Sequence, residues 1–142
     1  MKLIPLFLLV ACLLIGCSKG SESTADGDEG SQEKLTAKSF EPSMEAKQFF
    51  ADPKCVVWNE GFPLDELKTF TNDLYAAGAS KVLFAELSEI EGKQVSARYA
   101  VELPKDKARR DRCIAVWNKT FKDSDFEYDA KSGQDYLDMT MD

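Results

Sequence analysis

The sequence predicts a small α+β domain whose elements follow the order strand, helix, strand, strand, helix, strand, with a short helix before them. Two kinds of periodicity predict this class. Apolar residues recur at helical spacing after Pro63 and after Pro104, and they occupy every second position along residues 93–103. Residues 42–142 number roughly one hundred, which is enough for one core of ordinary size.

The first two predicted elements are short. Ser43 can cap a helix over Met44–Ala51, which should end before Asp52 because the residue preceding a proline avoids the helical region. The run Cys55–Trp58 is β-branched and aromatic, a pattern typical of a buried strand.

A longer helix is predicted between Pro63 and Gly78. Proline suits a first helical turn, and glycine suits the residue after the last one. The apolar residues of this segment fall on one helical face: Leu64, Leu67, Phe70, Leu74 and Ala77.

A β-hairpin follows the helix. Residues 81–90 form one predicted strand, residues 91–93 a turn, and a second strand runs on to Leu103. In that second strand a period of two indicates one buried face and one wetter face. The buried face is predicted to hold Val95, Ala97, Tyr99, Val101 and Leu103, and the wetter face Ser96, Arg98, Ala100 and Glu102.

The last two elements are a helix over Lys105–Phe121, with Ile114 and Trp117 on its apolar stripe, and a strand over Tyr136–Asp142. The complete order is that of the split βαβ, or ferredoxin-like, arrangement (βαββαβ). It predicts a four-stranded antiparallel sheet with two helices on one face.

The N-terminus carries a short apolar segment. Lys2 is followed by LIPLFLLVACLLIG, residues 3–16, which are too few to span a hydrocarbon core of about 30 Å as a helix but suit a signal peptide. The segment ends in Leu14-Ile15-Gly16-Cys17, which resembles the lipobox of bacterial lipoproteins. The resemblance implies that the Cys17 thiol receives a diacylglycerol and that the chain is cut before Cys17.

The same resemblance implies a protein held on a bacterial membrane, facing outside the cytoplasm. Ser18, rather than an aspartate, favours the outer membrane in a bacterium that has one. We therefore expect a signal peptide over residues 1–16, a lipidated N-terminus and disordered polar linker over 17–41, and one domain over 42–142. Residues 132–137 (SGQDYL) resemble a motif of uncharacterised small bacterial lipoproteins, which implies no activity.

The charge argues against some partners. The chain has 18 Lys+Arg, 25 Asp+Glu and no His. An acidic protein gains nothing from a polyanion by counterion release, so we expect no nucleic-acid partner, and anionic lipid is a poor partner for the surface as a whole. The basic run 105–112 is interpreted as a solvated helix face, with contact to an acidic partner or lipid headgroups as the alternative.

Cys55 and Cys113 are the two cysteines of the predicted domain. Outside the cytoplasm an even pair favours a disulfide, but two buried reduced thiols explain the pair as well. The sequence leaves these alternatives open. It has no C-x-x-C motif for a redox role.

Other chemistry finds little support. The acids Asp123, Asp125, Glu127 and Asp129 alternate as in a calcium loop, but Tyr128 stands where glycine must turn, so no metal site and no cofactor are predicted. Trp58 and Trp117 are interpreted as core residues. The absence of His from the sequence rules out a His-based catalytic triad.

Two functions fit these observations. The first is a non-enzymatic protein-interaction module of the cell envelope, with an unknown envelope protein as partner and the membrane bound through the N-terminal lipid. The alternative is a sensor domain that binds a small ligand. Only fold analogy supports the sensor, and fold does not imply function.

Overall fold

The computed structural model describes residues 34–57, 62–123 and 133–141. They belong to a compact unit, Glu33–Asp142, which is distinct from Met1–Gln32. Cys17 and the predicted signal peptide lie outside the described residues. Within the described ranges no helix is both long enough and apolar enough to cross a membrane.

The described residues form a mixed α+β fold with a five-stranded, largely antiparallel sheet and three α-helices. In chain order the elements are η1 (Ala37–Phe40), β1 (Ser43–Glu45), α1 (Ala46–Ala51), β2 (Cys55–Val57), α2 (Leu64–Ala77), β3 (Lys81–Ile90), β4 (Lys93–Glu102), α3 (Lys107–Phe121) and β5 (Tyr136–Thr140).

The sheet differs from the predicted four-stranded one. The hairpin β3–β4 lies at its centre, and β1 pairs antiparallel with the outer side of β3. On the other side, β4 pairs in parallel with β2 over residues 94–96 and antiparallel with β5 over residues 98–102. Because β2 has only three residues, it leaves the rest of that edge of β4 free for β5. A ferredoxin-like strand order is therefore not confirmed.

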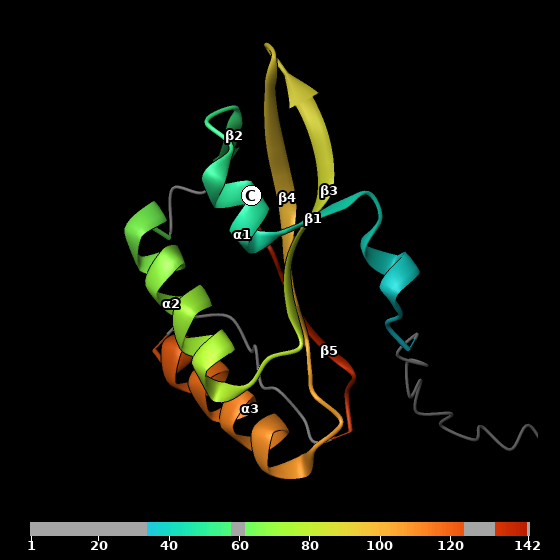
Figure 1. Cartoon of the computed structure of the whole chain (residues 1–142), viewed down its shortest axis with the longest axis vertical. Coiled ribbons are helices and arrows are strands. Elements are labelled where there is room, and N and C mark those ends of the chain that lie inside the picture. The colour runs from blue at the N-terminus through green and yellow to red at the C-terminus, as the bar shows by residue number, and fades with distance from the viewer. Residues whose placement is uncertain (1–33, 58–61, 124–132, 142) are drawn as a thin grey trace, which may run out of the picture. The chain divides into compact units, whose positions relative to one another are not determined.

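The main core lies between one face of the sheet and the helices, which Figure 1 shows on the same side of the hairpin. Its largest fully buried side chains include Trp117, Tyr99, Phe49, Phe84 and Leu74. Inside this core the Thr71 hydroxyl donates to the Leu67 carbonyl at 2.7 Å and lies 2.8 Å from the Tyr99 hydroxyl. The Tyr99 hydroxyl therefore donates to Thr71, so both buried hydroxyls are satisfied.

The second face of the sheet is covered by residues 34–42, which we call the N-terminal strap. Phe40 is fully buried there against Ala85, Ala100 and Tyr136. Its ring lies 5.0 Å from the ring of Tyr136, and the Arg98 guanidinium lies 5.1 Å from the Phe40 ring centre. The folded unit thus includes residues 34–41, which composition assigns to the linker, and the predicted wetter face of the sheet is covered there.

The alternation of the hairpin breaks midway. Glu86 has a positive φ of 52°, and it lies opposite Ala97, between the paired positions Ala85–Arg98 and Leu87–Ser96. Ser96 is buried and Ala97 exposed, the reverse of the prediction. The Ser96 hydroxyl lies 2.7 Å from the Ala85 carbonyl, so this buried polar group is satisfied.

The helices agree with the sequence except near their starts. Helix α2 ends at Gly78, whose φ of 110° and amide bond to the Leu74 carbonyl form a left-handed cap. Leu64 is 46% exposed and so lies off the predicted buried stripe. The helix predicted from Met44 begins at Ala46, because residues 43–45 pair with β3 instead.

Candidate interaction surface

The two cysteines do not form the disulfide that was one of the alternatives. Both thiols are free. Cys55 is half-buried with its sulfur 4.0 Å from the Met44 sulfur, whereas Cys113 is buried and lies 3.9 Å from the Leu74 carbonyl. Burial raises the pKa of each thiol, and Asp52 raises the pKa of Cys55 further. A raised pKa leaves little thiolate, which favours a packing role over a nucleophilic one.

The predicted acidic loop lies mostly outside the described residues, which include only Asp123 of its four acids. Across residues 34–57, 62–123 and 133–141, no cluster of three Cys, Asp or Glu side chains could hold a metal ion. Trp58 also lies outside the described residues. Trp117 is 1% exposed, which confirms that it belongs to the core.

The basic run 105–112 is only partly a solvated face. Arg110 donates to the carbonyls of Pro104 (3.1 Å) and Gln134 (3.0 Å) and pairs with Asp135. Arg112 donates to the Ala77 carbonyl at the end of α2. These two arginines tie α3 to neighbouring segments, and Lys107 pairs with Asp111 within the helix.

Along its outer edge β5 pairs with no described strand. The Leu103 amide donates to the Asp135 carbonyl (2.9 Å), and the Met141 amide donates to the Ala97 carbonyl (2.8 Å). In an antiparallel ladder bonded residues alternate with unbonded ones, so the odd-numbered residues of β5 bond to β4. The even-numbered residues therefore turn their N–H and C=O groups away from β4: Tyr136, Asp138 and Thr140.

Within the described residues, β4 is the sole strand paired with β5. Five residues with three outward-facing positions make a template on which an extended chain can add as a further strand.

The side chains beside this edge are held in place. Asp138 receives two hydrogen bonds from Arg98, through Nε at 2.8 Å and through Nη2, and Arg98 also pairs with Glu86 at 3.2 Å. Arg98 also contacts the Phe40 ring, so this one side chain links the N-terminal strap to Asp138 of β5.

The first residue before β5 is also fixed. Asp135 pairs with Lys34 of the strap at 3.1 Å and with Arg110 of α3 at 3.4 Å. Hydrogen bonding to Lys34, followed by its charge and that of Arg110, lowers the pKa of Asp135. The N-terminal end of the strap is thus attached where β5 begins.

Sequence reasoning finds the residues of β5 but not their role. Tyr136, Asp138 and Thr140 are correctly placed opposite Leu137, Met139 and Met141, and the latter three are buried in the main core. That β5 is an outer strand depends on its partner, which a local pattern does not encode. Polar residues such as Asp138 and Thr140 are a weak signal for an edge.

Comparison with known proteins adds no relative. The chain matches no known protein family, no curated protein and no solved structure.

Proposed function

We propose that this chain is a bacterial lipoprotein, anchored through Cys17 and facing outside the cytoplasm, whose folded domain is a non-enzymatic interaction module. The domain receives an extended segment of an envelope protein as a strand added to β5. One observation carries the binding mode: the outward N–H and C=O groups of three alternate residues along β5.

Strand addition suits this edge because main-chain hydrogen bonds supply affinity, while neighbouring side chains supply specificity. Next to the edge the Asp138 carboxylate is already compensated by Arg98, so an incoming strand meets no unpaired acid at the middle position. Thr140 is exposed at the far end and offers a hydroxyl to the partner.

The surroundings of the two thiols favour a packing role for Cys55 and Cys113, since burial raises the pKa of both. The fold itself is best interpreted as a rearranged split βαβ unit. Its βαββαβ order is retained from β2 onward, β2 and β4 are parallel, and β5 has moved to the free half of β4.

The anchor is tested by the intact mass of the protein extracted from membranes. A mass equal to residues 17–142 plus acyl chains supports the anchor. The mass of the full 142-residue chain would contradict it. A Cys17→Ala variant serves as the control that cannot receive the lipid.

The binding mode is tested with two variants at one position. Thr140→Pro removes an outward N–H and adds a ring on the open edge, whereas Thr140→Ala keeps the N–H. We expect crosslinking in cells to recover a specific envelope protein with wild type and Thr140→Ala, and at least tenfold less of it with Thr140→Pro. Equal recovery with both variants would contradict strand addition at β5.

A further inference from the structure

One end of the folded unit gathers basic side chains. The Ser80 amide donates to the Glu102 carbonyl, and Lys81 pairs with Glu102 in the sheet, so the start of β3 lies at the end of β4. The Arg109 side chain lies against Gly78, where an added Cβ would come within 3.1 Å of it. The turn after α2, the end of β4 and the start of α3 therefore meet at this end.

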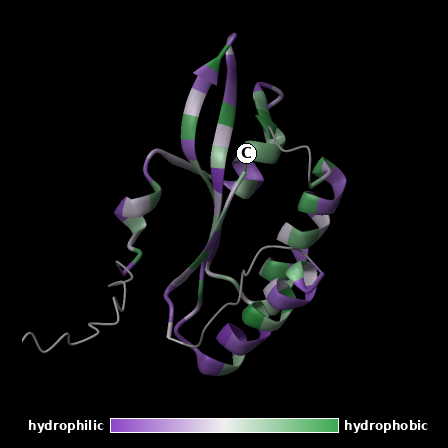
Figure 2. Cartoon of the chain, turned by 180° about the vertical axis from the view of Figure 1, so that it is seen from behind, coloured by the Kyte–Doolittle hydropathy of each residue, from purple (hydrophilic) through white to green (hydrophobic). Residues whose placement is uncertain are grey.

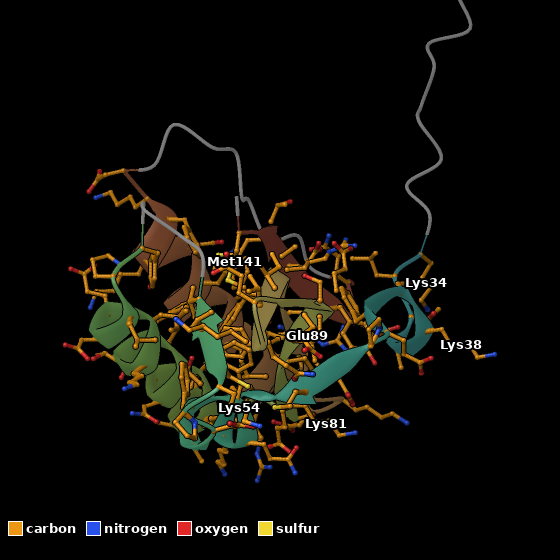
Figure 3. All side chains as sticks on the ribbon, turned by 90° about the horizontal axis from the view of Figure 1, so that it is seen from above. Lys34, Lys38, Lys54, Lys81, Glu89 and Met141 are labelled. Carbon is orange, nitrogen blue, oxygen red and sulfur yellow. The ribbon has the colours of Figure 1, made fainter. Side chains whose placement is uncertain are left out.

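The N-terminal strap begins at the same end. Lys34 pairs with Asp135, and Asp135 pairs with Arg110 in the second turn of α3. The chain that leads from residue 34 back to Cys17 therefore starts at this end. In Figure 3 the side chains of Lys34 and Lys81 project at the periphery, whereas Met141 lies among the core side chains.

The charges of this end are unequal. Among the described residues its acids number four: Glu102, Asp106, Asp111 and Asp135. Its described bases number seven: Lys34, Lys81, Lys105, Lys107, Arg109, Arg110 and Arg112. We call the surface that these seven residues form the basic end. Seven against four leaves an excess of three positive charges in a chain whose net charge is −7.

Most of these bases are exposed, although Lys34 and Lys107 each pair with an acid. The side chains of Lys34 and Lys107 are 78% and 88% exposed, and Lys81, Lys105 and Arg109 are exposed as well. In Figure 2 hydrophilic residues colour the start of α3. Beyond the Glu86–Arg98 pair, the far half of the β3–β4 hairpin is acidic instead, with Glu89 and Glu91 against Lys93.

We infer that the basic end binds an anionic phospholipid surface and turns the tip of the hairpin away from it. The inference rests on the proposed lipid anchor, since the anchor brings this end to the membrane. Lys and Arg side chains near an anionic surface are attracted to it, and the attraction falls off within a Debye length. An excess of three positive charges held close to the surface therefore biases the orientation of a tethered domain.

The test compares lysine reactivity of the whole mature protein on two kinds of vesicle. One is phosphatidylcholine alone, and the other is phosphatidylcholine and phosphatidylglycerol in equal parts. We expect amine acylation of Lys81, Lys105 and Lys107 to slow at least threefold on the anionic vesicles, with Lys54 and Lys93 unchanged. Salt at 1 M, where the Debye length is about 3 Å, should abolish the difference.

Two charge variants sharpen the test because they change the net charge equally at opposite ends. Lys105→Glu with Arg109→Glu should remove the protection of Lys81, whereas Lys54→Glu with Lys93→Glu should leave it. Equal acylation on both vesicles, or protection spread over all lysines, would overturn the inference. Failure to float with phosphatidylcholine vesicles would instead contradict the anchor, so the two proposals fail separately.

Discussion

The sides of β3 and β5 that face away from β4 are treated differently by the chain. Between Val82 and Leu87, outward groups of β3 have partners: the Val82 amide donates to the Tyr75 hydroxyl (3.4 Å), β1 pairs with residues 83–85, and the Leu87 amide donates to the Pro42 carbonyl (3.3 Å). Along β5 no described residue pairs with the outward groups of alternate positions.

This difference indicates where association can occur. An unpaired edge can form main-chain hydrogen bonds with another chain. Proteins commonly prevent this with free charges, prolines or covering segments at the edge. The β3 edge has a covering segment. The β5 edge contains no proline, and its only charged residue, Asp138, is paired with Arg98. We therefore place recognition at β5.

The largest expected effect comes from breaking the bonded side of β5. Met139→Pro removes an N–H that bonds to β4 and leaves a carbonyl of β4 unpaired, a loss of about 1–3 kcal/mol, to which the ring clash adds. Chemical denaturation should show this loss relative to Met139→Ala, which removes the buried side chain but keeps the amide. Relative to wild type, loss of the buried Met139 side chain costs about 2–5 kcal/mol more. Equal stabilities of the two variants would mean that Met139 does not bond to β4.

Removing the Phe40 ring should have the next largest effect. Phe40 packs on Tyr136 of β5 and Ala85 of β3, so Phe40→Ala leaves a cavity between the strap and the sheet. Substitutions of this type cost about 3–5 kcal/mol, and we expect the lower value because the strap can collapse onto the small residues beneath it. Denaturation measures the loss. An effect below 1 kcal/mol would show that the strap is not part of the folded unit.

Tyr75→Phe should lower stability less than the two changes above, and it tests the covered side of β3. It removes the acceptor of the Val82 amide and the donor to Glu45, and we expect a loss of about 1 kcal/mol. Burial, followed by the hydrogen bond to Glu45, raises the pKa of Tyr75 to about 12. A raised pKa stabilises the folded state fully below the ordinary value of about 10, and this contribution is lost as the pH rises through 12.

Stability measured from pH 9 to pH 12 should therefore fall less steeply in Tyr75→Phe than in wild type. The remaining slope includes Tyr99, Tyr136, Cys55 and Cys113, whose pKa values are also raised by burial. Identical slopes in the two proteins would exclude a role for the Tyr75 hydroxyl at the β3 edge.

Thr140→Pro should have the smallest effect on stability. Its N–H points away from β4, so the substitution breaks no ladder bond, and proline is tolerated on an edge strand. We expect a free energy of unfolding within about 0.5 kcal/mol of that of Thr140→Ala. A loss as large as that of Met139→Pro would show that the register of β5 is wrong by one residue.

The elements with strong local signals follow from the sequence. Leu67, Phe70 and Leu74 define α2 by their spacing, and Gly78 ends it; the β3–β4 hairpin also forms within two residues of its predicted bounds. Local periodicity suffices for these elements because their apolar faces repeat several times.

The strap, β1 and the partner of β5 were missed for a different reason. Phe40 is one aromatic residue in a polar stretch, and residues 43–45 gain strand structure only from β3. The position of β5 depends on the edge that the short β2 leaves free. The candidate surface follows from these long-range pairings, so the sequence predicts its residues without their role.

The most direct measurement is residue-resolved amide hydrogen exchange along β5 in the purified full chain. We expect an alternation, with the amides of Tyr136, Asp138 and Thr140 exchanging at least a hundredfold faster than those of Leu137, Met139 and Met141. Uniformly slow exchange along the strand would mean that its outer edge is already paired, and it would contradict recognition at β5.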